Sequence, residues 1–173
     1  MDDFRYPIGK FEQIENPTSK QRNKWIEDIS ETGKILRLAV ENLTIEQLLT
    51  QYRPGGWTVQ QVIHHLADNN MNAFIRFKKA LTEDSPAANS YREDLWAELS
   101  DYRTPIESSL SLLESINIRI VAILRALHPS DFKRTFTSPT HGVMSLNVAI
   151  QRYVWHDRHH ISQIESLKER MGW

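Results

Sequence analysis

The chain has 173 residues, of which 40% are hydrophobic, and its formal net charge is −1. This length can bury one apolar core without disulfides or a structural metal, so a single domain covering residues 1–173 is expected. Because its basic residues are scattered and it has neither a long apolar run nor an apolar leader, the chain is expected to be cytoplasmic, with no nucleic-acid or membrane partner.

The N-terminal segment is predicted to be an arm followed by a long helix. Proline and glycine disfavour regular helix there, so residues 1–17 are expected to be extended and packed on the body. Thr18 or Ser19 then caps a helix in which Gly33 is the weak point. The apolar positions at roughly helical spacing in this segment are Trp25, Ile29, Leu36, Val40 and Leu43.

Two Thr-x-x-Gln patterns mark further helix starts. The pattern at Thr44 predicts a short helical turn, and the same pattern at Thr58 predicts a long helix over residues 59–81. This second helix carries the adjacent His64 and His65, which diverge by about 100° around the helix axis. Both histidines lie off the centre of the apolar stripe, so periodicity alone does not separate them.

A polar stripe runs beside the apolar face of this helix. Asn69, Asn72 and Arg76 fall on the same flank as His65. A stripe of this kind is either a solvated helix face or one wall of a binding site, and the sequence leaves both interpretations open.

A long connection leads to the third long helix. Residues 87–103 are polar and predict a loop with one short helix, which is too long a link for adjacent antiparallel helices. The sequence Thr104-Pro-Ile-Glu then predicts a helix with Thr104 as its cap and Pro105 at its first position. Apolar residues at steps of three and four carry this helix to His128, a histidine at a helix end that we interpret as structural.

The last helix follows a loop rich in Pro, Thr, Ser and Gly. Within that loop only residues 133–137 are expected to be extended, and His141 is left out of the site because a loop histidine beside glycine is more often solvated. Ser145 caps a helix that reaches about Arg170. Four long amphipathic helices, one long crossover and no clear sheet predict an all-α four-helix bundle.

Two histidines on the last helix have the spacing of a metal clamp. His156 and His160 lie one turn apart, so both imidazoles can reach one divalent ion. Two histidines are an incomplete site, and partly buried histidines hydrogen-bonded at a helix surface are the competing interpretation. His159 points nearly the opposite way and is expected to be exposed to solvent.

Short segments in a fixed order run through nearly the whole chain. They are Tyr6-Pro-Ile-Gly9, Gly55-Gly-Trp-Thr-Val59, Val62-Ile-His-His-Leu-Ala-Asp68, Asp131-Phe-Lys-Arg134, Tyr153-Val-Trp-His156 through His160, and Arg170-Met-Gly-Trp173. Together they resemble the DinB/YfiT-like family and its YfiT-type branch. The resemblance implies a four-helix bundle, often a homodimer, with one divalent ion per chain held by three histidines.

The resemblance also assigns the metal ligands. In the family, one ligand precedes the Leu of a His-Leu pair, and two come from the His-x-x-x-His of the last helix. Carried over to this sequence, the ligands are His65, His156 and His160, which selects His65 over His64. Zinc is the expected ion, and nickel is an alternative because three imidazoles accept several divalent ions.

The resemblance implies chemistry on a small-molecule substrate. Members of this branch are described as metal-dependent hydrolases, and related members look like S-transferases that use a low-molecular-weight thiol such as bacillithiol. A three-histidine ion with open positions can activate either water or a thiol. The chain has no cysteine, so any reacting thiol must come from outside.

The residues that hold a substrate are less well defined by the sequence. Asn72 and Arg76 are candidates for anchoring a carboxylate, and Tyr153 is a candidate donor one turn before His156. No His-Glu-x-x-His motif is present, so the general base of a metalloprotease is missing from its usual place. The rival function is a stress-related bundle that binds a metal or small molecule without turnover.

Overall fold

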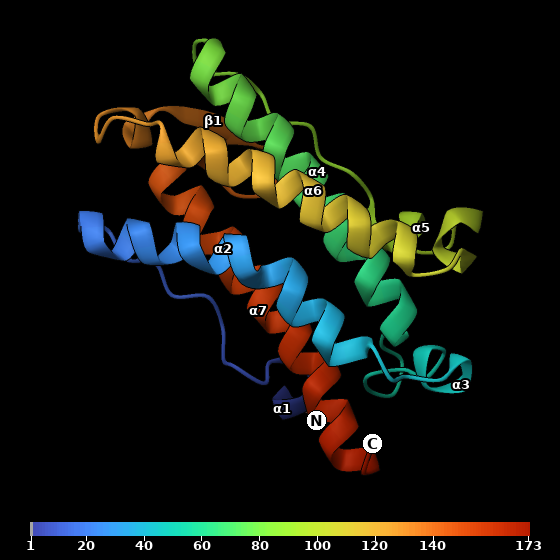
Figure 1. Cartoon of the computed structure of the whole chain (residues 1–173). Helices are drawn as coiled ribbons and strands as arrows, with labels where there is room; N and C mark the ends of the chain where they lie inside the picture. Colours follow the sequence, from blue (N-terminus) through green and yellow to red (C-terminus); the bar gives the residue numbers. More distant parts are fainter. Residues whose placement is uncertain (1) are drawn as a thin grey trace.

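Four long helices form the body of the protein. The computed structural model describes residues 2–173, with side chains from residue 4 onward. The long helices are α2 (Ser19–Val40), α4 (Val59–Thr82), α6 (Glu107–Arg125) and α7 (Leu146–Met171). Helix α2 packs on α6 and α7, and α4 packs on the same two helices (Figure 1). The predicted all-α four-helix bundle is therefore confirmed.

The helix ends follow local hydrogen-bonding groups in the sequence. Thr18, Thr44 and Thr58 each accept a hydrogen bond from the backbone three residues later, and the glutamine there bonds back to the threonine backbone. These capping boxes begin α2, the short α3 (Ile45–Leu48) and α4. Ser145 caps α7, and Gly172 ends it in the left-handed conformation with φ 69°.

The start of α6 differs from the prediction. Thr104 does not cap this helix, because its hydroxyl donates to the Asp101 carbonyl at 2.6 Å and its backbone N–H bonds the same carbonyl. Those bonds close a short 3₁₀ helix, η1 (Ser100–Arg103), and α6 begins at Glu107 without a side-chain cap. The crossover thus holds two short helices, η1 and α5 (Glu93–Trp96), where one was expected.

Three further segments also differ from the predictions. Residues 2–5 of the predicted extended arm form a short helix, α1 (Asp2–Arg5), and position 1 lies outside the described residues. A hairpin of β1 (Thr135–Ser138) and β2 (Gly142–Ser145) follows the 3₁₀ turn η2 (Asp131–Lys133), where no clear sheet was expected. Helix α6 ends at Arg125, before His128. Two four-residue strands are too short to show a period in the sequence.

A polar layer divides the core into two apolar clusters. On α4 the clusters are interrupted over residues 68–70, and on α7 they are interrupted over residues 155–160. Between the clusters, the Asn70 amide donates to Asp157 Oδ1 at 2.9 Å, and both side chains are 1% exposed. The layer therefore joins α4 to α7 by hydrogen bonding inside the bundle.

Helices α2 and α6 approach closely across the bundle. A Cβ at Gly33 would lie 2.6 Å from Glu114 Cγ, so glycine is required for this approach. Nearby, the buried Asn117 amide donates to the Ile29 carbonyl at 3.2 Å. The predicted weak point of α2 is therefore a packing position. No helix between residues 2 and 173 combines the length and apolar character needed to cross a bilayer.

Ile150 and Ile118 provide a test of the core. Ile150 of α7 is 0% exposed, whereas Ile118 of α6 is 71% exposed. We expect Ile150→Ala to lower the free energy of unfolding by about 2–5 kcal/mol, because it leaves a cavity. Ile118→Ala should change it by no more than about 0.5 kcal/mol. Urea unfolding followed by circular dichroism measures both, and equal losses would contradict this assignment of the core.

Candidate metal centre

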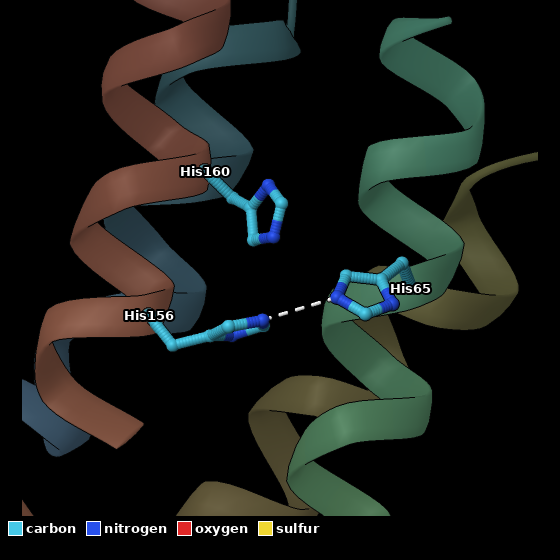
Figure 2. Close-up of side chains that lie close together, drawn as sticks. All are labelled: His65, His156 and His160. Carbon is cyan, nitrogen blue, oxygen red and sulfur yellow. Dashed lines mark hydrogen bonds between the residues drawn. The ribbon is translucent and has the colours of Figure 1, made fainter. Parts of the chain in front are cut away.

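Three histidines from two helices share one space in the polar layer. Figure 2 shows His65 of α4 facing His156 and His160, which stand one turn apart on α7. One ring nitrogen from each lies within 4.8 Å of those of the other two. Nitrogens bound to one zinc ion at about 2 Å lie roughly 3–4 Å apart, so small side-chain movements would let all three hold one ion.

Burial favours the neutral form of two of these imidazoles, His65 and His160. Burial, then the neighbouring His156, lowers the pKa of His65 well below its ordinary value. Burial, then His156 and His65, lowers the pKa of His160 in the same way. Neutral imidazole is the form that coordinates a metal, because it keeps a free lone pair.

The shortest contact in the cluster joins two ring nitrogens. The Nε2 atoms of His65 and His156 are 3.1 Å apart, the contact dashed in Figure 2. At this distance two lone pairs repel, so either one nitrogen carries a proton or a cation lies between them. The donor set therefore fits a divalent ion.

The adjacent His64 has a different environment. Its Nδ1 is 2.7 Å from the Ser109 hydroxyl, and its Nε2 is 3.1 Å from the Thr104 carbonyl. Both ring nitrogens are thus used in bonds that join α4 to α6 and its preceding loop. Periodicity could not separate His64 from His65, and the structure brings only His65 into the cluster.

Gln163 sets the orientation of His160. Its amide nitrogen donates to the Arg5 carbonyl at 2.8 Å and to His159 Nε2 at 2.9 Å. Its amide oxygen must therefore accept a hydrogen bond from His160 Nδ1, which lies 2.9 Å away. With the proton on Nδ1, the Nε2 of His160 is free to coordinate. Sequence reasoning missed Gln163, although its position three residues after His160 on one helix face was a usable signal.

His156 lies beside an amide group, and His65 lies beside an aromatic ring. The Asn69 amide group lies 3.1 Å from His156 Nδ1, whereas Asp157 Oδ1 is 3.8 Å away, too far for a hydrogen bond. The Trp57 ring packs 4.6 Å from the His65 ring, centroid to centroid. An amide and an aromatic ring therefore surround these two imidazoles, and no carboxylate is hydrogen-bonded to them within residues 4–173.

His159 is buried, which corrects the prediction that it faces solvent. It is 6% exposed, its ring stacks on Trp155 at 4.8 Å, and the Tyr6 ring lies 5.5 Å away. The N-terminal arm covers this side of α7, a contact that helix periodicity cannot reveal. Burial, then His156 and Arg5, lowers the pKa of His159 to about 4.

The histidines line a cavity of about 750 Å³. Two predicted substrate residues, Arg76 and Tyr153, line it as well, and Arg76 Nη1 donates to the Tyr153 hydroxyl at 2.8 Å. Asn72 is not among the lining residues, and its amide donates to the carbonyl of Asp68 in its own helix. Asn69 lines the cavity in the place predicted for Asn72.

The crossover and the hairpin supply lining residues that the sequence did not assign to the site, among them His141, which was expected to be solvated. Glu93 places Oε2 4.0 Å from His65 Nε2, and the Tyr91 hydroxyl is buried with no hydrogen-bond partner among the described side chains. Arg152 and His141 also meet at the cavity wall, with 3.0 Å between Nη2 and Nε2. Segments without regular periodicity carry most of these residues, so no pattern in the sequence marked them.

The chain is similar to known proteins over most of its length. The family described as the DinB superfamily matches residues 28–164. A protein of Bacillus mycoides (strain KBAB4), named "Putative metal-dependent hydrolase", is 45% identical over 173 residues and is covered over 100% of both chains. A protein of Oceanobacillus iheyensis with the same description is 48% identical over 169 residues, 98% of each chain.

A solved structure has the same fold. The chain matches YfiT from Bacillus subtilis with a TM-score of 0.96 and 46% sequence identity, over 99% of each chain. That protein is described as "a probable metal-dependent hydrolase with an unusual four-helix bundle topology". The sequence-based resemblance to the DinB/YfiT-like family is confirmed.

Gln163 and Gln151 form a matched pair for testing the orientation of His160. Gln151 also ties the N-terminal arm to α7, through the backbone of Ile14 at 2.8 and 3.1 Å, but has no hydrogen bond to a histidine. We expect Gln163→Leu to weaken zinc binding by about 10–100-fold, because His160 loses the acceptor that holds its tautomer. Chelator competition measures the affinity.

Gln151→Leu is the control for the docking of the arm and should leave zinc affinity nearly unchanged. Equal losses in the two variants would assign the effect to the arm. An unchanged affinity in Gln163→Leu would refute the orienting role.

Proposed function

Because the chain belongs to the DinB superfamily, we propose that it is a metal-dependent hydrolase whose single ion is held by His65, His156 and His160. The observation that carries this proposal is the convergence of three imidazoles at a cavity of small-molecule size. When bound, a divalent ion would act as a Lewis acid and lower the pKa of a water or thiol.

We propose zinc as the ion, one per chain, with nickel as the alternative. Neutral imidazoles are common zinc ligands, and three of them leave room for a further ligand in a tetrahedral site. Imidazole also suits nickel, so the donor set does not by itself select one ion. The support for zinc is therefore the ligand type together with its general availability.

Two residues of the cavity wall are proposed to position the substrate. The Tyr153 hydroxyl accepts a hydrogen bond from Arg76 Nη1, so its own proton remains available for a substrate oxygen. Arg76 is fixed on its other side, where Nη2 donates to the Asn89 carbonyl at 2.9 Å. Both side chains are therefore held before any substrate arrives, which lowers the entropic cost of binding.

Thiol transfer is a second candidate reaction. The cavity of about 750 Å³ lies in the upper part of the range found for ligand sites, so it has room for a low-molecular-weight thiol and an electrophile together. The chain itself contains no cysteine, so the thiol, for example bacillithiol, would be a co-substrate. Hydrolysis needs only one organic substrate and remains the first proposal.

A homodimer is proposed from the family resemblance. Large apolar side chains are exposed on the outer faces of α2 and α6, among them Leu38 at 54% and Ile118 at 71%. Exposed apolar surface of this kind is compatible with a contact between two copies. Multi-angle light scattering of the purified protein distinguishes a dimer from a monomer.

The assignment of the metal ligands predicts the behaviour of His156→Ala. This variant should lose stoichiometric metal while its helical circular dichroism stays close to wild type, because both apolar clusters remain intact. His128→Ala, which removes a histidine outside the site, is the control and should keep one ion per chain. Elemental analysis gives the ratio of metal to protein, and retention of the ion by His156→Ala would refute the site.

The reaction is tested by two assays on metal-loaded protein. We expect hydrolysis of small ester or amide substrates that is lost in both His65→Ala and His156→Ala. Consumption of an added thiol in the presence of an electrophile, lost in the same variants, would instead assign the transferase reaction. A fully loaded protein that is inactive in both assays would favour the non-catalytic binding bundle.

A further inference from the structure

The cavity carries positive charge that the protein does not neutralise. Its wall contains five arginines and two carboxylates: Arg5, Arg53, Arg76, Arg92 and Arg152, with Glu93 and Asp94. Arg92 is paired with Asp94. For the side chains from residue 4 onward, no ion pair joins the other four arginines to a carboxylate.

Two arginines outside the cavity show how carboxylates neutralise a guanidinium that connects two long helices. Arg37, which joins α2 to α6, is bonded to both Glu107 and Glu114. Arg158 of α7 is paired with Asp28 of α2. Both of these arginines have carboxylate partners, whereas Arg5, Arg53, Arg76 and Arg152 of the cavity have none among the described side chains. Outside the cavity, Arg134 and Arg170 also bond only to backbone carbonyls.

Among the described side chains, Arg152 is an unpaired cation of the cavity that packs between an aromatic ring and an imidazole. It is half-buried, its guanidinium lies 4.7 Å from the centre of the Phe11 ring, and Nη2 is 3.0 Å from His141 Nε2. Burial lowers the pKa of Arg152, which reflects the cost of holding a cation there. A guanidinium nevertheless stays charged in proteins, so this cost remains until an anion arrives.

Arg76 faces the same part of the cavity. Its two bonds go to the neutral Tyr153 hydroxyl and Asn89 carbonyl. Burial, then Arg152 and then Arg76, lowers the pKa of His141, so both guanidiniums act on one imidazole. His141 sits on the turn between β1 and β2, and the hairpin thus closes this side of the cavity.

We propose that Arg152, Arg76 and His141 form an oxyanion-binding subsite, so that the substrate carries a carboxylate or phosphate group. Guanidinium forks match both groups by bidentate hydrogen bonding. Arg152 precedes His156 by four residues, so their backbone positions lie about 6 Å apart along α7, slightly more than one helical turn. That the bound anion is part of a substrate rests on the proposed function. That an anion binds here at all follows from the arginines alone.

The subsite is tested on metal-free, full-length protein. Isothermal titration at constant ionic strength, with inorganic phosphate and with succinate as separate probes, measures binding without any contribution from an ion. Wild type should bind at least one probe saturably, and Arg152→Gln should weaken that binding about tenfold or more. Phosphate binding alone would identify a phosphate subsite, and succinate binding alone a carboxylate subsite.

Two control variants separate the subsite from general charge. Arg158→Gln removes a guanidinium two turns further along α7, outside the cavity, and should bind as wild type does. Arg152→Lys keeps the charge without the planar fork and should recover part of the affinity. Circular dichroism of each variant confirms that the bundle is intact. Wild type that binds neither probe, or Arg152→Gln that binds as well as wild type, would overturn the proposal.

A parallel zinc titration tests the metal centre independently of the oxyanion subsite. Saturable anion binding without zinc binding would refute the metal centre and leave the oxyanion subsite standing. Zinc binding at the histidines without anion binding would refute the subsite alone.

Discussion

The structure depends on a polar layer buried across the middle of an apolar bundle. Polar groups removed from water cost free energy unless they are hydrogen-bonded, so this layer is stable only where partners are built in. The bond from Asn70 to Asp157 and the bonds of Gln163 meet much of that requirement between α4, α7 and the N-terminal arm. The same layer places His65, His156 and His160 on rigid helices, where their mutual positions are well defined.

Segments outside the four helices complete the site around this layer. The arm holds Gln163 through the Arg5 carbonyl, and the Trp57 ring from the turn before α4 lies against His65. The crossover brings Glu93 close to the histidines, and the hairpin brings His141 to Arg152. The helices therefore carry the three clustered histidines together with Arg76 and Arg152, while the connections add further residues to the cavity wall.

The two parts of the cavity have different electrostatics. At the histidines, burial keeps two of the three imidazoles neutral, which suits coordination of a divalent ion. One turn along α7, cations stand without carboxylates, which suits a negatively charged group. A substrate that spans both parts would place its reacting group at the ion and its anionic group at the arginines.

The sequence by itself determined the bundle, most helix starts and one pair of candidate ligands. Periodicity at 3.6 residues and capping groups such as Thr58 and Ser145 act over a few residues, so they can be recognised in one sequence. The same local geometry placed His156 and His160 together, while the choice of His65 over His64 needed the family resemblance. Local signals also failed at Thr104, whose hydroxyl bonds to a preceding 3₁₀ turn instead of α6.

Only the tertiary structure decided which polar residues meet. His159 is buried because an arm more than 150 residues away in sequence covers it, and Gln163 matters because it bonds that arm and His160 together. Likewise, Arg152 meets His141 only because a hairpin without a recognisable sequence period folds over α7. Contacts between distant segments depend on how whole elements pack, and local periodicity carries no information about that packing.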